Sequence, residues 1–193
     1  TMERKTSGLL VLHHGKVALE KYAPSFSQES TTNSMSMAKT ILALLVGIAI
    51  DEGKIHSEKD SVALYLPEWK NDSRKNITLE HLLQMTSGLD FNDDSNNLLS
   101  DLVSMHIGTQ IKPLILATKP KKAPGIEYEY LNANSQILSL ILERATGQRY
   151  SHYLSEKLWE PLGAGTAHLW LDREEGTPKA YCCFFASLRD WGK

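Results

Sequence analysis

Two features that would assign a protein class at once are missing from this sequence. Its 193 residues hold 21 basic and 23 acidic side chains, so the formal charge is only −2 and no basic stripe suggests a nucleic-acid partner. Its longest apolar run covers residues 41–50, whereas a membrane-spanning helix needs about 18 residues or more. Hydrophobic residues still make up 41% of the chain, which is enough for a packed core and excludes the disordered class.

Cysteine is also scarce, because the chain has only Cys182 and Cys183, side by side. Adjacent residues on a strand point to opposite faces, so a bridge between them would be strained, and we expect two free thiols, one of them in the core. No Cys/His spacing predicts zinc, and His13-His14 would face apart on a strand. The acidic and amide cluster at residues 93–97 lacks the spacing of a calcium loop. We therefore expect no metal and no cofactor.

A secretion-type apolar segment is absent from the amino end, which leaves the bacterial periplasm and the cytoplasm both open as compartments. The length suits one domain, or one domain with part of another. The oligomeric state has no signal in the sequence.

What the sequence does contain is a series of short strand and helix patterns. The amino end predicts a strand pair, residues 8–13 and 17–22, joined by a turn at His14-Gly15. Residues 25–33 are polar and rich in serine and threonine, so we expect a loop there.

Helical spacing of apolar residues predicts the rest of the fold. The segment 36–50 is apolar on nearly all sides beyond its first turn, so we expect a buried helix that ends at a left-handed Gly53. Thr78 fits the N-cap of a short helix that Gly88 ends. The remaining predicted elements are helices at 98–105, 135–146 and 150–158, a helix start at 189–191, and a strand pair at 170–172 and 180–185.

Ser36 and Lys39 lie in the first turn of the apolar helix, three residues apart and therefore on the same side. A serine hydroxyl becomes a good nucleophile when a neighbouring base takes its proton, and a lysine can be that base where burial disfavours its ammonium form. The helix amino terminus also presents free N–H groups to a developing oxyanion. The alternative is that Ser36 caps the helix and Lys39 reaches solvent, since a chain of this composition has about one such pattern by chance.

The second candidate is Tyr130-Leu-Asn132, which lies between a Pro-Gly turn and an amphipathic helix. From a loop, a tyrosine can pass a proton to a leaving group, and an asparagine can hold both the lysine and a substrate amide. The alternative is a loop tyrosine that packs on the following helix.

The two motifs in this order resemble the serine β-lactamase and penicillin-binding-protein superfamily, whose nucleophile motif is Ser-x-x-Lys. The Tyr-x-Asn form is similar to that of class C β-lactamases and their esterase relatives. Further segments that resemble the superfamily are residues 8–17, 77–89 and 124–147. The tail, residues 170–191, is similar to the 6-aminohexanoate-dimer hydrolase branch in particular.

The resemblance implies an α+β fold, the α/β sandwich of β-lactamase type, in which helices flank an antiparallel sheet and a helical region adjoins it. It also implies that Ser36 is the acylated nucleophile, that Lys39 is its general base, and that the backbone amide of Ser36 is one oxyanion donor. Tyr130 would share the proton transfer and protonate the leaving group. Asn132 would orient Lys39 and the substrate.

One motif of the superfamily is missing. The third motif, Lys or His followed by any residue and then Gly, should lie on a strand downstream of the tyrosine, and nothing after Asn132 fits it. His106-Ile-Gly108 has the letters but precedes the tyrosine. The last strands of the sheet would come from the same missing part. We therefore expect residues 1–193 to be the amino-terminal portion of a single β-lactamase-like domain, in a protein of roughly 300–400 residues.

These observations predict a metal-free serine hydrolase that forms an acyl-enzyme with a small amide, lactam or ester. Lactams, D-amino-acid peptides, short esters and aminohexanoate oligomers all stay open as substrates, and specificity would lie partly in the loops of residues 91–122. The alternative is a non-catalytic binding module of the same fold. The missing third motif favours that alternative, and the intact Ser36, Lys39, Tyr130 and Asn132 disfavour it.

Overall fold

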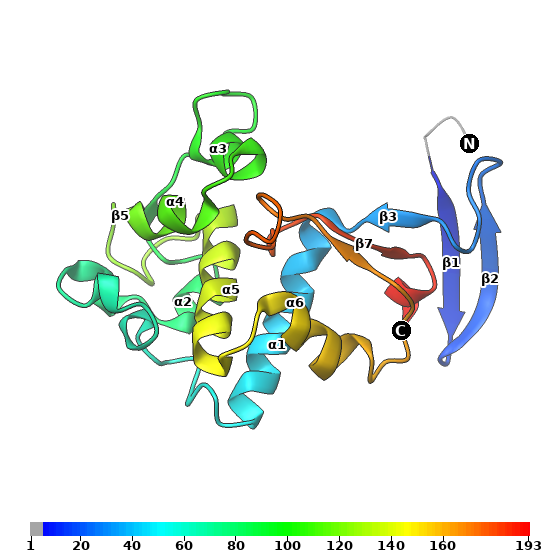
Figure 1. Cartoon of the computed structure of the whole chain (residues 1–193), viewed down its shortest axis with the longest axis horizontal. Helices are drawn as coiled ribbons and strands as arrows, with labels where there is room; N and C mark the ends of the chain where they lie inside the picture. The colour runs from blue at the N-terminus through cyan, green and yellow to red at the C-terminus, as the bar shows by residue number, and fades with distance from the viewer. Residues whose placement is uncertain (1–5) are drawn as a thin grey trace.

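A computed structural model describes residues 6–193 of the chain (Figure 1). At one end of its long axis lies a hairpin of β1 (Gly8–His13) and β2 (Lys16–Tyr22), which pair antiparallel as predicted. His14 and Gly15 both have positive φ, 48° and 72°, which is the conformation that a two-residue type I′ hairpin turn requires.

A small antiparallel sheet follows the hairpin toward the middle of the molecule (Figure 1). Its strand order is β3 (Thr31–Asn33), β7 (Phe184–Ser187) and β6 (His168–Leu169), so the centre strand comes from the carboxyl end of the described chain. The predicted loop at 25–33 therefore contains a strand. The predicted second strand pair exists, but each partner is displaced by a few residues because Cys182 and Cys183 form a turn instead of continuing the strand.

The opposite end is built mainly from helices (Figure 1). They are α1 (Ala38–Asp51), α2 (Leu79–Leu83), α3 (Asp101–Ile107), α4 (Ile111–Ala117), α5 (Asn132–Thr146) and α6 (Tyr150–Leu154). Short 3-10 turns lie at η1 (Met35–Met37), η2 (Val62–Leu64), η3 (Pro67–Trp69), η4 (Ser73–Asn76) and η6 (Asp190–Gly192). A π-helical turn, η5 (Ser155–Trp159), extends α6. The two-residue strands β4 (Leu89–Asp90) and β5 (Lys119–Pro120) pair antiparallel. Together, the antiparallel sheets and helices make an α+β fold.

Helices α1 and α5 pack on each other in the middle of the molecule, between the small sheet and the other helices (Figure 1). Most of the apolar side chains of α1 are buried, including Leu42 and Leu45 at 1% and 0% exposure. Leu44 on the other side is 52% exposed, so the prediction of a helix buried on all sides is wrong for one face. Within residues 6–193 this face is open to solvent at Leu44, whereas the opposite face meets α5.

The predicted helix ends are confirmed at Thr78, Gly53 and Gly147, but α2 ends at Leu83, before the predicted stop at Gly88. The Thr78 hydroxyl accepts the N–H of His81 at 3.2 Å, and the His81 ring accepts the N–H of Thr78 at 3.1 Å, so this capping box satisfies two N–H donors at the start of α2. Gly53 and Gly147 adopt left-handed φ values of 68° and 71° after α1 and α5. None of the helices described for residues 6–193 combines the length and the apolar composition that a membrane span requires.

Candidate active site

Ser36 lies in the single turn η1, directly before α1. Met35, which precedes it, has φ 48°, a left-handed value that is uncommon for a residue with a side chain. The Asn33 side chain accepts the backbone N–H of Met35 at 3.0 Å and so holds this bend. Because the chain turns sharply here, the Ser36 side chain projects from the start of the helix and is exposed.

Lys39 lies in the first turn of α1 and reaches back to Ser36, as the three-residue spacing predicts. Its Nζ lies 3.1 Å from Ser36 Oγ, 2.7 Å from Asn132 Oδ1 and 2.8 Å from the backbone carbonyl oxygen of Tyr181. All three oxygen atoms lie within hydrogen-bond distance of Nζ, so contacts with three residues fix the end of the Lys39 side chain. The sequence alternative, in which Lys39 extends into solvent, is wrong.

Tyr130 approaches Ser36 from the other side. Its hydroxyl donates to Ser36 Oγ at 2.8 Å, although the two residues are 94 positions apart. The ring also lies near the lysine, with Nζ 5.1 Å from the ring centre, which is within the range of a cation–π contact. The structure therefore brings together all four residues that the sequence singled out.

Asn132 is the first residue of α5, and an acidic group holds its side chain in place. While Asn132 Oδ1 accepts from Lys39, its Nδ2 donates to both carboxylate oxygens of Asp93, at 3.1 and 2.9 Å. This pattern fixes which way the amide points. Burial raises the pKa of Asp93, and the hydrogen bonds from Asn132 act in the opposite direction.

Asp93 and Tyr181 are the two site residues that the sequence reasoning missed. The sequence suggests Asp93 only as a possible calcium ligand, and no spacing links it to Asn132, which lies 39 positions later. Tyr181 contributes a backbone oxygen, so its residue type holds no signal. Its ring lies beside His106, whose Nδ1 is 3.2 Å from the Tyr181 hydroxyl.

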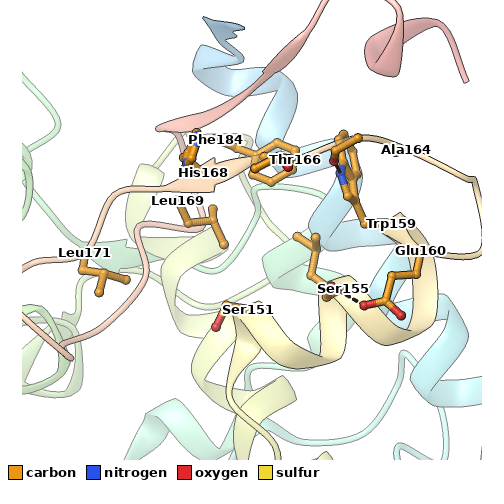
Figure 2. A pocket seen from close by; sticks show the side chains of 13 residues that line it. Ser151, Ser155, Trp159, Glu160, Ala164, Thr166, His168, Leu169, Leu171 and Phe184 are labelled. Carbon is orange, nitrogen blue, oxygen red and sulfur yellow. Dashed lines mark hydrogen bonds between the residues drawn. The ribbon is translucent and has the colours of Figure 1, made fainter. Parts of the chain in front are cut away.

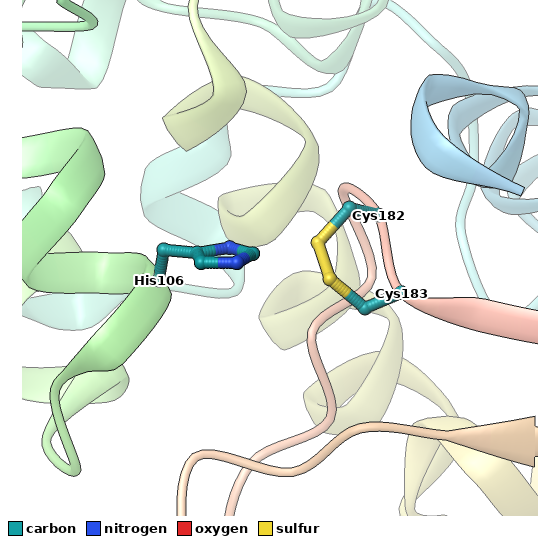
Figure 3. Close-up of side chains that lie close together, drawn as sticks. All are labelled: His106, Cys182 and Cys183. Atoms are coloured by element: carbon teal, nitrogen blue, oxygen red, sulfur yellow. A yellow bond between two sulfur atoms is a disulfide. The ribbon is translucent and has the colours of Figure 1, made fainter. Parts of the chain in front are cut away.

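The cysteine prediction is wrong. Cys182 and Cys183 are joined by a disulfide, at 9% and 1% exposure (Figure 3). The prediction assumed a strand, but Cys183 has φ 65° and lies in a turn, where adjacent side chains do not have to point to opposite faces. The prediction of a core position is confirmed.

The described residues bring one set of metal-ligand types together, namely His106, Cys182 and Cys183 (Figure 3). The two sulfur atoms are bonded to each other, so neither is a thiolate that could bind a metal in this form. Burial and the charge of Lys179 lower the pKa of His106, which favours the neutral ring.

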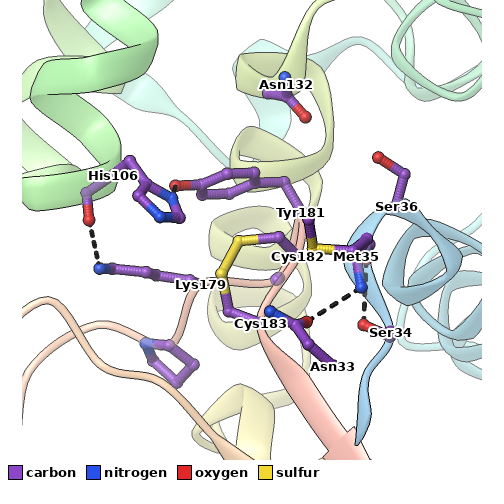
Figure 4. The surroundings of a disulfide bond; sticks show 12 residues. Asn33, Ser34, Met35, Ser36, His106, Asn132, Lys179, Tyr181, Cys182 and Cys183 are labelled. Carbon is purple, nitrogen blue, oxygen red and sulfur yellow. Dashed lines mark hydrogen bonds between the residues drawn. A yellow bond between two sulfur atoms is a disulfide. The ribbon is translucent and has the colours of Figure 1, made fainter. Parts of the chain in front are cut away.

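A cavity of about 380 Å³ opens beside Ser36. Its wall is largely apolar, and the residues that line it include Ser36, Asn132, His106 and both cysteines of the disulfide. Figure 4 shows these groups around the turn at Cys182 and Cys183. The cavity can therefore hold a small molecule with a reactive carbon next to Ser36 Oγ.

A larger cavity, about 720 Å³, lies between the α6–η5 helix and β6 (Figure 2). Its serines are Ser151 and Ser155, and Ser155 Oγ donates to a carboxylate oxygen of Glu160 at 2.8 Å. Neither a lysine nor a tyrosine is among the residues that line it. The hydrogen bonds that join a serine to both a lysine and a tyrosine are found at Ser36.

Comparison with known proteins finds relatives by sequence. The beta-lactamase family profile matches residues 1–183. The 6-aminohexanoate-dimer hydrolase of Paenarthrobacter ureafaciens is 29% identical over 172 residues, which are 84% of this chain and 44% of that protein.

Two solved structures share the fold. A penicillin-binding protein from Bacillus halodurans superposes with a TM-score of 0.74 at 17% identity and covers 95% of this chain and 67% of its own. A class C beta-lactamase superposes with a TM-score of 0.67 at 19% identity, and the match covers 89% of this chain and 50% of the beta-lactamase chain. The chain thus spans less than half the length of the hydrolase that it matches in sequence. With a family profile that covers nearly all of its residues, and with the fold of these structures, the chain belongs to the beta-lactamase family.

Proposed function

We propose that this chain carries the nucleophile of a serine hydrolase that cleaves an amide, lactam or ester through an acyl-enzyme. The observation that carries the proposal is the position of Ser36 Oγ, within hydrogen-bond distance of both Lys39 Nζ, at 3.1 Å, and the Tyr130 hydroxyl, at 2.8 Å. A nucleophile needs one group to take its proton and a second to return a proton to the leaving group, and these two groups meet at its oxygen.

In the first step, Ser36 Oγ attacks the carbonyl carbon of the substrate, and the hydroxyl proton passes to the neutral amine of Lys39. The backbone N–H of Ser36 would stabilise the oxyanion. Tyr130 then gives its proton to the leaving amine or alcohol and regains one from Lys39. The bond to the leaving group breaks, and the acyl group stays on Ser36 as an ester.

In the second step, water replaces the leaving group. It loses a proton to the same basic groups and attacks the ester carbon, which releases a carboxylic acid and restores the Ser36 hydroxyl. Asn132 would orient Lys39 through both steps and would also contact the substrate amide. Asp93 accepts from Nδ2 of Asn132 and so keeps Oδ1 directed at Lys39.

The substrate class stays broad. The matching relative named 6-aminohexanoate-dimer hydrolase places a linear amide among the candidates, beside lactams, D-amino-acid peptides and short esters. The third motif expected for the superfamily would have to come from outside these 193 residues, and we propose that the chain forms the amino-terminal portion of such a domain.

Covalent labelling tests the nucleophile. A fluorophosphonate should label the purified protein once, and Ser36→Ala should abolish the label, a loss of at least about a thousandfold in rate because no other oxygen replaces the nucleophile. The matched control is Ser155→Ala in the larger cavity, which should be labelled like the unchanged protein. Labelling that persists in Ser36→Ala and disappears in Ser155→Ala would move the site to the other cavity. A folded protein that is never labelled would favour the binding-module alternative.

A further inference from the structure

The disulfide between Cys182 and Cys183 closes the turn that precedes β7, and this turn lies directly against the candidate active site (Figure 4). Cys183 has φ 65°, in the left-handed region that favours glycine and is uncommon for cysteine. Without the disulfide, a cysteine at position 183 would favour a negative φ. A covalent link between neighbours restricts the peptide group that joins them, so the bond and the turn support each other.

This turn presents one backbone oxygen to the candidate base. The carbonyl of Tyr181, immediately before Cys182, accepts from Lys39 Nζ at 2.8 Å. The other two acceptors of Lys39 are side-chain oxygens, on Ser36 and Asn132. Of the three, only the Tyr181 oxygen depends on the conformation of the cysteine turn.

The chain is fixed on both sides of the turn. Before it, the N–H of Ala180 donates to the Gln136 side chain at 3.1 Å. After it, the carbonyl of Phe184 accepts the N–H of Ser34 at 2.8 Å. The Cys183 carbonyl also accepts the N–H of Trp170 at 3.1 Å, so a change at the disulfide would act mainly on the peptide groups of Tyr181 and Cys182 and leave the flanking segments in place.

The disulfide can also be reached from outside. Both cysteines line the cavity of about 380 Å³ that opens at Ser36, together with His106 and Tyr181. A small dithiol that enters this cavity meets the sulfur atoms without unfolding the protein.

We propose that the Cys182–Cys183 disulfide is a reducible positioning element for Lys39, a role that rests on the proposed function. An external dithiol would supply the electrons. One of its thiolates attacks a cysteine sulfur, forms a mixed disulfide and releases the other cysteine as a thiolate, which takes up a proton. The second thiol of the reagent then displaces the remaining cysteine, so the protein gains two thiols and the reagent becomes a disulfide. Cys183 can then leave its left-handed conformation, and the Tyr181 carbonyl loses its fixed direction toward Lys39.

The test compares the oxidised and reduced protein by two measurements. Reduction should remove one hydrogen bond from Lys39 as it takes up a proton, so we expect fluorophosphonate labelling of Ser36 to slow about tenfold. The labelling rate should recover on reoxidation. The ¹³Cε resonance of Lys39, observed after lysine-selective labelling, should shift on reduction and return with reoxidation. Thiol titration confirms which form is present.

A matched pair of variants separates positioning from general stability. Both remove the disulfide: Cys182→Ser with Cys183→Ser, and Cys182→Ser with Cys183→Gly. Glycine adopts a positive φ freely, so the glycine variant should label Ser36 faster than the serine variant, and neither should respond to the dithiol. Circular dichroism checks that both are folded.

The outcomes for the two proposals are distinct. A Lys39 resonance that is the same in oxidised and reduced protein overturns the positioning role, whether or not Ser36 is labelled. Equal labelling of the serine and glycine variants at the rate of the oxidised protein overturns it as well. A shifted Lys39 resonance in a protein that is never labelled supports the positioning of Lys39 and overturns the proposed hydrolase.

Discussion

The amino-terminal hairpin and the α1–α5 layer use the same apolar residue types with opposite results. Leu45 of α1 is fully buried, whereas Leu9 of β1 is 49% exposed. The hairpin forms a two-stranded sheet of its own within residues 6–193, while α1 packs directly on α5. Apolar content alone therefore does not decide what becomes core. Because Ser36 and Asn132 lie at the starts of the packed layer, the site should depend on that layer and tolerate changes in the hairpin.

The largest effect should come from the packed layer. Leu45→Ala removes a fully buried side chain and should lower the free energy of unfolding by about 2–5 kcal/mol, as a cavity-forming substitution does. Urea denaturation followed by circular dichroism measures it. The neighbouring Leu44→Ala is the control, since Leu44 is 52% exposed on the same helix. Equal losses in the two variants would show that the exposed face of α1 is covered in solution.

A smaller effect distinguishes the ion pairs of the two regions. In the helical region, Arg144 of α5 holds Glu68 at 2.7 Å and lowers the pKa of Glu68 from 4.5 to about 2. A lowered pKa means that the contribution of the pair to the free energy of unfolding is complete above pH 4.5 and is lost as the pH falls from 4.5 to about 2. Both side chains are substantially exposed, so the pair should contribute less than about 1 kcal/mol.

In the Glu68→Gln variant, the free energy of unfolding should therefore decrease less as the pH falls from 4.5 to about 2. Urea denaturation above pH 4.5 and within this range measures the difference. Glu20→Gln in the hairpin is the matched variant, because Arg189 likewise lowers the pKa of Glu20. The pKa of Glu20 is lowered less than that of Glu68, so we expect the smaller change there. A larger pH effect in Glu20→Gln would reverse the ranking of the two regions.

The smallest effect should come from the hairpin surface. Leu9→Ala removes a half-exposed side chain and should change the free energy of unfolding by no more than about 0.5 kcal/mol, with the rate of Ser36 labelling unchanged. A cost close to that of Leu45→Ala would mean that another surface covers the hairpin in solution. Light scattering over a range of concentrations would then show whether that surface belongs to a second copy.

The local elements could largely be predicted from the sequence. The hairpin, the apolar helix, the Thr78 cap and the glycine stops at Gly53 and Gly147 all follow from periodicity and turn chemistry within a few residues. The errors fall where partners are distant. β3, in the predicted loop, pairs with β7, which lies about 150 positions away in the chain. A local sequence pattern does not predict such a distant partner.

The candidate site divides in the same way. The three-residue spacing of Ser36 and Lys39 is enough to place them on one side of a helix, whereas their roles in catalysis stay a prediction. The resemblance to a family predicted that Tyr130 and Asn132 belong to the same site. In the structure, all four residues are connected by hydrogen bonds. Asp93 could not be found from sequence, because it touches Asn132 only after the loop folds back on the start of α5.

The sequence by itself determined the local parts of this protein, because helix spacing, capping and turn preferences depend on atoms only a few residues apart. Tertiary structure alone decided that Lys39 has three acceptors from three segments, and that Cys182 and Cys183 form a bond in a turn. The physical reason is distance along the chain. Packing of α1 on α5, and of β7 beside β3, brings groups 93 and 142 positions from Lys39 to the same nitrogen, and no local propensity specifies that meeting.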